Sequence, residues 1–156
     1  MKVLGVDPGL SVTGYGLVEI KDGQPTLTEA GVVRMPRQAA IEVRLASLYD
    51  GLNDIIQEYR PDIMAIEEVY IKGDRPETGL KMGHARGVLF LAAAKKGIPV
   101  VSYQATGVKK ALTGNGRASK EQVQAMVKVI LGLDSLPGPA DVSDALAVAL
   151  CYCNKI

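Results

Sequence analysis

Four carboxylates lie where apolar segments of the chain end or begin. Asp7 follows the largely apolar run at residues 2–6, and Glu67 follows the run at residues 63–66. Asp141 and Asp144 open an alanine-rich segment at 140–147. A carboxylate beside a buried segment is costly unless it is paired or holds a metal ion. Oxygen ligands of this kind suit Mg²⁺, which binds a few carboxylates together with substrate phosphate oxygens, so the pattern indicates phosphate chemistry on a metal ion.

Each of these acids also has a plain structural interpretation. Asp7 precedes Pro8-Gly9 and can begin a turn, and Asp141 can stabilise a helix N-terminus through the helix dipole. The four together are harder to explain in this way, because structural acids prefer exposed positions. Glu68 follows Glu67 directly and faces the opposite side of a strand, so the residues alone leave open which of the two would be a ligand.

The segments around the acids predict alternating strands and helices. Apolar runs and turn signals predict strands at 2–7, 12–20, 26–34, 62–67 and 98–103, with a hairpin turn at 21–24. Apolar spacing predicts helices at 41–59, 77–96, 107–112 and 140–152, and a further helix after a capping box at 119–122. This order favours an α/β fold, in which a mixed sheet of about five strands carries helices on both faces.

In such a sheet, functional sites gather at strand ends. We therefore expect Asp7 and Glu67 side by side at the carboxyl ends of two neighbouring parallel strands. Asp141 and Asp144 share one face of the last helix, because they are three residues apart. The first turn of that helix is expected beside the two strand ends.

Composition favours one ordinary globular domain over residues 1–156, with 47% hydrophobic and 22% charged residues. No apolar run approaches the roughly 20 residues that span a membrane, and the N-terminus lacks a signal pattern. We therefore expect a cytoplasmic protein with no membrane partner. Cys151 and Cys153 would point to different faces of a helix, which argues against a disulfide or a zinc site.

The formal net charge of +1 hides a segregation of charge along the chain. Residues 72 to 128 hold eleven Lys/Arg and three acids, a net +8, whereas the rest of the chain holds seven bases and fourteen acids, a net −7. Scattered lysines commonly form solvated helix faces. A basic segment beside an acidic cluster is also what a polyanion-cleaving protein requires, and nucleic acid is favoured over a small anionic ligand.

Four separated motifs follow one another along nearly the whole chain: Gly5-Val6-Asp7-Pro8-Gly9 with Thr13-Gly14-Tyr15-Gly16, Ala65-Ile66-Glu67-Glu68-Val69-Tyr70, Ala85-Arg86-Gly87, and Ala140-Asp141-Val142-Ser143-Asp144-Ala145-Leu146-Ala147. In these motifs and their order the chain resembles the RuvC family, the bacterial Holliday junction resolvases. The resemblance implies an RNase H-like fold, a homodimer, and Mg²⁺-dependent paired nicking of a four-way DNA junction. It also implies cooperation with the branch-migration proteins RuvA and RuvB.

The resemblance assigns roles to individual acids. It implies that Glu67, and not Glu68, is a metal ligand. The implied catalytic metal ligands are Asp7, Glu67, Asp141 and Asp144. Two Mg²⁺ ions about 3.5–4 Å apart, or Mn²⁺ in their place, would activate a water, hold the scissile phosphate and stabilise the leaving oxygen. No nucleophilic side chain is then required, in keeping with a chain that has no Ser-His-Asp or Cys-His set.

The resemblance also assigns residues to DNA. Lys109 and Lys120 match positions of functionally important lysines near the scissile phosphate, and Lys120 would neutralise charge on that phosphate as a catalytic residue. An exposed lysine in the first turn of a capped helix is the plain alternative for Lys120. Tyr70 stands where the family commonly has Phe, and either stacks on a base or covers the edge of the core. The expected DNA-binding set is Tyr70, Lys81, Lys109, Lys110, Arg117 and Lys120.

Three glycines recur four residues apart in the helix predicted at 77–96. Each costs a helix roughly 1 kcal/mol relative to alanine, so we expect another backbone to approach them closely. The approaching element can be another helix of the same chain. The resemblance instead favours a twofold dimer interface, formed by Gly79, Met82, Gly83, Arg86, Gly87 and Phe90.

Three other functions are weighed against junction cleavage. Asp7-Pro8-Gly9 resembles the first phosphate loop of the actin and sugar-kinase class, but that class needs two such domains and a longer chain. A YqgF-type RNase H-like nuclease acting on structured RNA fits the same acids and bases. A non-catalytic junction-binding protein is disfavoured by the intact set of four acids.

Overall fold

The computed structural model describes residues 1–9, 11–70 and 73–156. Within these residues five strands form one mixed sheet in the order β3-β2-β1-β4-β5. The strands are β1 (Lys2–Asp7), β2 (Val12–Lys21), β3 (Gln24–Arg34), β4 (Ile63–Glu67) and β5 (Val100–Tyr103). The number of strands and their mixed arrangement confirm the prediction from sequence.

The first three strands form an antiparallel meander, and the last two add in parallel. The hairpin between β2 and β3 turns at Asp22 and Gly23, which both have positive φ, of 50° and 78°. Two such residues form the tight turn that suits the right-handed twist of a hairpin. The predicted strand at 98–103 begins later, at Val100, because the Ile98 N–H donates to the Ala93 carbonyl of the preceding helix (2.9 Å) and Pro99 has no N–H to donate.

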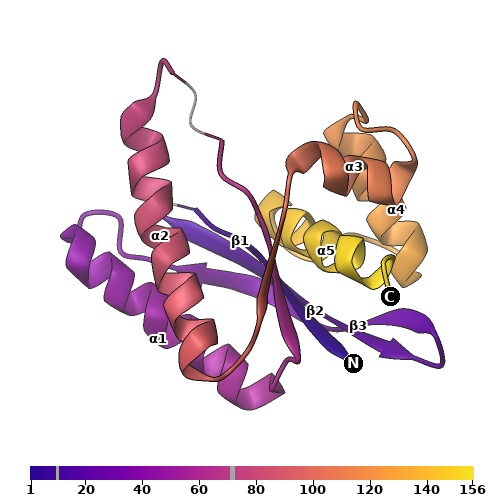
Figure 1. The fold of residues 1–156 in the computed structure, drawn as a ribbon, viewed down its shortest axis with the longest axis horizontal. Coiled ribbons are helices and arrows are strands. Elements are labelled where there is room, and N and C mark those ends of the chain that lie inside the picture. The colour runs from indigo at the N-terminus through magenta and orange to yellow at the C-terminus, as the bar shows by residue number, and fades with distance from the viewer. Residues whose placement is uncertain (10, 71–72) are drawn as a thin grey trace.

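Helices cover both faces of the sheet (Figure 1). α1 (Ile41–Tyr59) and α2 (Pro76–Lys95) lie on one face, and α3 (Ala105–Thr113), α4 (Lys120–Leu131) and α5 (Ala140–Cys153) lie on the other. The capping box is confirmed, because the Gln122 N–H donates to Ser119 Oγ and the Ser119 N–H donates to Gln122 Oε1. α3 extends beyond the predicted 107–112, and Gly114 caps its C-terminus with a φ of 78°, which suits glycine.

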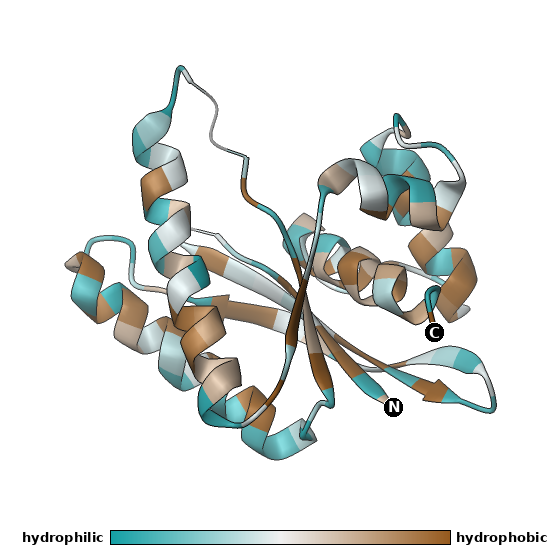
Figure 2. Cartoon of the chain, viewed as in Figure 1, coloured by the Kyte–Doolittle hydropathy of each residue, from teal (hydrophilic) through white to brown (hydrophobic). Residues whose placement is uncertain are grey.

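Alternation along β1 divides the core into two layers. Leu4 and Val6 pack with α1 and α2, whereas Val3 packs with α3, α4 and α5. Hydrophobic residues accordingly run along both the strands and the inner sides of the helices (Figure 2). Cys151 and Cys153 are buried within the second layer as free thiols.

α5 lies unusually close to the sheet because β1 and β2 present glycines to it. A Cβ added to Gly5 would lie 2.9 Å from the Cβ of Ala149, and one added to Gly14 would lie 2.9 Å from the Cβ of Asp141. At Gly16 the added Cβ would overlap the side chain of Leu146. We call Gly5, Gly14 and Gly16 the glycine seam. It sets the first turn of α5 directly against the end of β1.

Across the described ranges, with residues 10, 71 and 72 outside them, no helix is long and apolar enough to cross a membrane.

Candidate active site and metal centre

Two of the predicted acids end neighbouring parallel strands. Val6 of β1 pairs with Ile66 of β4, so the next residues, Asp7 and Glu67, end the two strands together. Both side chains are half-buried, whereas Glu68 is exposed. Asp144 acts electrostatically on Glu67, while Glu68 acts on Arg86 of α2. The two adjacent glutamates therefore have different charged neighbours, and Glu67 is the one that lies near the other acids.

α5 brings the remaining two acids to the same place. Asp7 lies opposite Gly14 in the β1–β2 ladder, and the absence of a side chain at Gly14 lets the backbone of Asp141 approach. Buried Ser143 donates to the Ala140 carbonyl (2.9 Å) and accepts from Gln124 of α4 (3.3 Å), which ties the first turn of α5 to α4. Packing therefore holds this turn in place.

The electrostatics of the site reflect an excess of negative charge. Burial, together with the nearby carboxylates of Asp144, Asp141 and Glu67, raises the pKa of Asp7 to about 8, while Lys120 acts in the opposite direction. Burial and Asp144 likewise raise the pKa of Glu67, which Lys109 and Lys120 oppose. We call Asp7, Glu67, Asp141 and Asp144 the acidic cluster. Burial and the neighbouring negative charges therefore disfavour the ionised forms of Asp7 and Glu67, and a cation would relieve this.

The acidic cluster suits a divalent cation by its chemistry. As the side chains stand, no three His, Cys, Asp or Glu residues in the described parts of the chain are grouped so as to hold a metal ion. All four donors are nevertheless carboxylates, the ligands that hard cations prefer. A bound cation would also oppose the burial and the carboxylate repulsion that raise the pKa of Asp7. The residues therefore fit a divalent metal ion after reorientation of their side chains.

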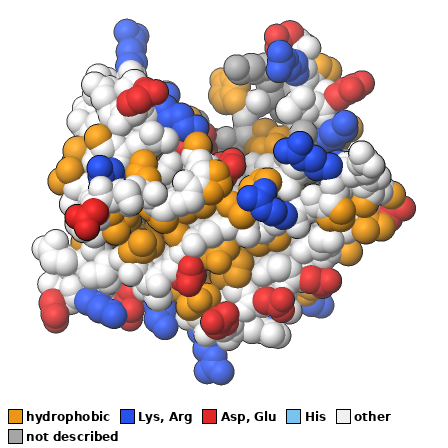
Figure 3. Space-filling view, turned by 180° about the vertical axis from the view of Figure 1, so that it is seen from behind, with side chains coloured by type: hydrophobic (Ala, Val, Ile, Leu, Met, Phe, Trp, Pro, Cys, Tyr) orange, Lys and Arg blue, Asp and Glu red, His pale blue; other side chains and the backbone are white. Residues whose placement is uncertain are grey.

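Two cavities flank Glu67. One, of about 260 Å³, lies between β4, α3, α4 and α5 and contains Lys109, Lys120 and Asp144 in its wall. Lys120 Nζ lies 3.3 Å from Asp144 Oδ2. The other, of about 190 Å³, is lined by Glu67, Glu68, Tyr70, Gln104, Ala105 and Thr106. The surface is hollowed between its two upper lobes, where acidic side chains lie close to basic ones (Figure 3).

Tyr70 extends away from the body of the protein. Its side chain is 88% exposed, although it helps to line the smaller cavity beside Glu67. The alternative that Tyr70 covers the edge of the core is therefore wrong. The exposed ring is available to a ligand that enters the hollow.

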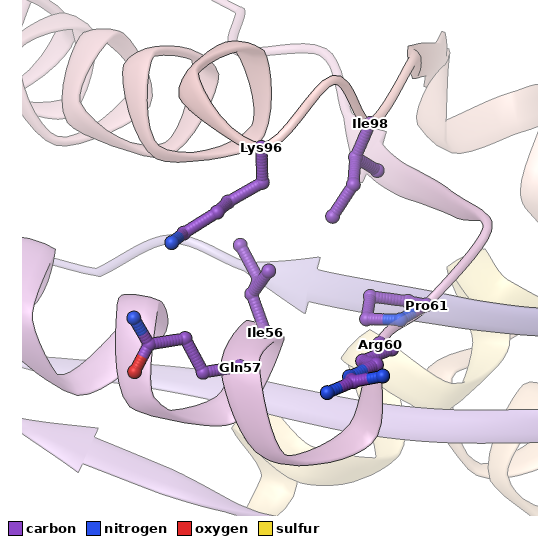
Figure 4. A pocket seen from close by; sticks show the side chains of 6 residues that line it. All are labelled: Ile56, Gln57, Arg60, Pro61, Lys96 and Ile98. Carbon is purple, nitrogen blue, oxygen red and sulfur yellow. The ribbon is translucent and has the colours of Figure 1, made fainter.

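The basic segment is divided by the fold. Lys109 and Lys120 border the acidic cluster, and Lys81, Lys110 and Arg117 are exposed. Lys96 instead lines a cavity of about 530 Å³ with Arg60, Pro61 and Ile98, where α1 and α2 end and β4 is about to begin (Figure 4). This cavity therefore lies at the opposite end of β4 from Glu67. Lys72, the first residue of the segment, lies outside the described residues.

Two of the three glycines of α2 are not covered by the residues that the structure describes. None of those residues lies within 4 Å of a Cβ added to Gly83 or Gly87, whereas Gly79 is buried. Packing by another helix of the same chain is therefore wrong for Gly83 and Gly87. Leu80 and Leu91 are 64% and 53% exposed on this helix, and Met82 is half-buried.

Sequence reasoning missed the contact that Arg86 makes. We expected Arg86 at a dimer interface, but its Nη1 donates to the backbone carbonyl of Glu67, and its guanidinium lies 5.1 Å from the centre of the Phe90 ring. The placement of Arg86 in a motif of its own, Ala85-Arg86-Gly87, was the available signal. Its target is a backbone atom, which a sequence pattern does not reveal.

Comparisons with known proteins agree over the full length of the chain. The family model described as crossover junction endodeoxyribonuclease RuvC matches residues 3–152. The RuvC of Rhodopirellula baltica is 47% identical over 149 residues, covering 96% of this chain and 84% of that protein. The RuvC of Caldanaerobacter subterraneus subsp. tengcongensis is 46% identical, covering 99% and 93%.

Solved structures agree as well. Thermus thermophilus RuvC superimposes with a TM-score of 0.91 at 34% identity, covering 99% of this chain and 94% of that one. The yeast mitochondrial Holliday junction resolvase Ydc2, at 14% identity and a TM-score of 0.66, shares the fold, which is the RNase H-like nuclease fold. With these matches, and with its acidic cluster at the strand ends, the chain belongs to the RuvC family of crossover junction endodeoxyribonucleases.

Proposed function

We propose that this chain is a structure-selective endonuclease that resolves four-way (Holliday) DNA junctions by paired nicks in recombination and repair. Its membership of the crossover junction endodeoxyribonuclease family supports this reaction. A relative that is 32% identical over 99% of this chain, T. thermophilus RuvC, forms a complex with a Holliday junction substrate. The observation that carries the proposal is that four acids from three elements act electrostatically on one another beside a cavity that Glu67 and Asp144 line together with Lys109 and Lys120.

The acidic cluster is the proposed metal site. A nuclease of this family uses a divalent metal ion, and we assign it to Asp7, Glu67, Asp141 and Asp144 as Mg²⁺, with two ions per site and Mn²⁺ as a substitute. The bound ions supply an activated water and neutralise charge on the phosphate. Burial of Asp7 and Glu67 in the protein keeps their carboxylates poorly hydrated, which strengthens their attraction to a cation.

The lysines beside the acidic cluster have a second role. Lys120 is a counter-ion to Asp144 in the absence of substrate. When DNA and metal ions occupy the hollow, the ammonium group of Lys120 would turn from Asp144 to the scissile phosphate and stabilise its developing charge. Lys109, from α3, lines the same cavity from another side. The two lysines would thus orient the phosphate against the acids.

DNA binding is assigned to the exposed groups around the hollow. The ring of Tyr70 would stack on a base at the open centre of the junction. Lys81, Lys110 and Arg117 would contact phosphates, so log affinity should fall linearly with log salt concentration. Removing the charge of Lys110 should flatten that slope without creating a sequence preference.

The assembly is proposed to be a homodimer through α2. Gly83 and Gly87 leave open space for a second backbone, and exposed Leu80, Phe90 and Leu91 would become buried in the same contact. A junction that is cut on two opposed strands requires two active sites, which twofold symmetry supplies. RuvA and RuvB remain the proposed branch-migration partners, the cytoplasm the proposed location, and residues 1–156 the proposed single nuclease domain.

A synthetic four-way junction tests the proposal directly. With Mg²⁺ we expect paired nicks at symmetrical positions. With Ca²⁺ we expect binding but little cutting, because its looser coordination positions the phosphate poorly. Linear duplex DNA and structured RNA of similar length are the control substrates. Preferential cutting of the RNA would replace this function with the RNA-directed alternative, and binding without cutting in Mg²⁺ would replace it with a purely architectural role.

A further inference from the structure

Arg86 reaches from α2 to the end of the strand that carries Glu67. Its side chain is half-buried, and Nη1 donates to the Glu67 carbonyl oxygen. On the other side of the same peptide group, the Glu68 N–H donates to the Tyr103 carbonyl (2.8 Å). Both polar groups of the peptide between Glu67 and Glu68 are therefore held. A peptide plane held at both polar groups restricts rotation about the Cα–C bond of Glu67, and so limits the directions in which the Glu67 side chain can leave the backbone.

This contact has a cost that a solvated arginine would avoid. Burial lowers the pKa of Arg86, whereas the negative charge of Glu68 raises it. The guanidinium also lies 5.1 Å from the Phe90 ring centre, one turn along the same helix. Two directed contacts therefore hold a desolvated charged group at one backbone atom. Hydrogen bonds from a charged donor are stronger than neutral ones, which suits a structural restraint at this point.

The restraint acts at the end of the strand. β4 ends at Glu67, and the chain leaves the sheet immediately afterwards on its way to α2. Without Arg86 the peptide after Glu67 would be held through the Glu68 N–H alone, so the Glu67 carbonyl could tilt about that bond and the carboxylate would move with it. Since Glu67 must face Asp7 and Asp144 to share a cation, a small rotation would separate the ligands.

We propose that Arg86 is a positioning residue that holds the Glu67–Glu68 peptide, and thereby sets the affinity of the acidic cluster for its divalent metal ion. The proposal rests on the function proposed above, in which Glu67 is a metal ligand. It gives Arg86 a role that is separate from any contact between two copies of the chain. It also links the position of α2 to the geometry of the metal site.

The experiment compares Arg86→Gln and Arg86→Lys with wild type and with Lys95→Gln. Lys95 is an exposed cation at the far end of the same helix, so Lys95→Gln removes the same charge away from the site. Mg²⁺ binding is measured by calorimetry without DNA, and the Mg²⁺ concentration for half-maximal junction cleavage is measured in parallel. Loss of a group that orients a metal ligand typically costs about 10–100-fold in metal affinity.

We expect Arg86→Gln to weaken Mg²⁺ binding and to raise the half-maximal Mg²⁺ concentration by about tenfold or more. Saturating Mg²⁺ should restore most of the cleavage rate. Arg86→Lys keeps the charge but loses the planar fork, so it should fall between wild type and Arg86→Gln. Lys95→Gln should match wild type in both measurements.

Three results would overturn the proposal. The first is wild-type Mg²⁺ affinity in folded Arg86→Gln. The second, if Arg86→Gln does not fold, is wild-type Mg²⁺ affinity in folded Arg86→Lys. The third is a rate that falls equally at every Mg²⁺ concentration while the variant sediments as a monomer, because that identifies Arg86 as an interface residue. Glu67→Gln separates this proposal from the proposed function: full Mg²⁺ binding and cleavage by that variant would refute the metal site itself.

Discussion

Two helices on opposite faces of the sheet, α5 and α2, differ in how their neighbourhood uses glycine. α5 has ten buried residues and rests on the glycine seam, with backbone against backbone. α2 turns Gly83 and Gly87 to open space and exposes Leu80 and Leu91. Glycine thus serves two purposes in one chain. In the sheet it allows a helix of the same chain to approach closely. In α2 it leaves a surface that the described residues do not cover.

This difference separates the two tasks of the protein. The acids on α5 cannot shift without disturbing the sheet, so their distance from Asp7 is maintained by packing. α2 keeps a free apolar face and reaches the site through Arg86. We therefore expect substitutions on the α5 side to affect chemistry and stability, and substitutions on the α2 side, Arg86 excepted, to affect assembly and DNA.

The largest expected effect comes from an acid in the first turn of α5. Asp141→Asn should abolish junction nicking, because it removes a metal ligand, while junction binding stays intact or strengthens as repulsion of phosphate falls. Glu77→Gln changes an acid in the first turn of α2 and should cleave normally. Gel assays of nicking and binding measure both. Normal turnover by Asp141→Asn would contradict the division of tasks between the two helices.

A second prediction concerns the stability of the metal-free protein. Burial and the neighbouring carboxylates raise the pKa of Asp7 from its ordinary value of 3.8, expected in the unfolded chain, to about 8 in the folded one. Between these values the folded state holds the additional proton, so the free energy of unfolding should fall as pH rises from about 4 to about 8. Urea unfolding in EDTA measures this slope, which Asp7→Asn should flatten. Asp50→Asn, at an exposed position on α1, should retain it.

The glycine seam gives a third prediction. A Cβ at Gly5 would meet the backbone of Ala145 and the Cβ of Ala149, neither of which can rotate away. Gly5→Ala should lower the free energy of unfolding by about 3 kcal/mol, at the upper end of the usual range for overpacking. Thermal and chemical unfolding measure the loss. A variant as stable as wild type would mean that α5 can retreat from the sheet, and its cleavage rate would then report how far the acids moved.

Tyr70 tests the α2 side of the hollow. Because its ring is exposed and stacking on a base is worth about 1–3 kcal/mol, Tyr70→Ala should lose roughly tenfold or more in cleavage rate at an unchanged thermal midpoint. Tyr70→Phe keeps the ring face and should cut nearly normally. Junction cleavage by Tyr70→Ala at the wild-type rate would remove the stacking role.

The smallest effect is expected at Gly87, and its sign should be opposite to that at Gly5. An added Cβ meets open space there, so Gly87→Ala should stabilise the isolated chain by up to about 1 kcal/mol through helix propensity. The same methyl group would obstruct a second backbone and weaken self-association. Unfolding at low concentration and sedimentation at high concentration measure the two effects. Unchanged association would move the dimer interface away from Gly87.

Most of the fold was predictable because local signals agree with tertiary packing. The helix at 41–59 has the bounds expected from its apolar spacing, and the Asp22-Gly23 turn follows from two residues that tolerate positive φ. The ends of β5 and α3 differ from expectation, because hydrogen bonds and prolines at element junctions decide them. The pairing of Asp7 with Glu67 followed from the expectation that two apolar strands, each ending in an acid, would be parallel neighbours.

The sequence by itself determined where the candidate acids and bases lie, which strands and helices bear them, and the family to which the motifs belong. Tertiary structure decided which of those residues meet. It gave Glu67 and Glu68 different burial, divided the basic segment between the two ends of β4, and directed Arg86 to a backbone carbonyl. The physical reason is that a side-chain pattern indicates the period and the buried face of one element only. Contacts between elements depend on how closely two backbones approach. Here the glycines of the seam set that distance.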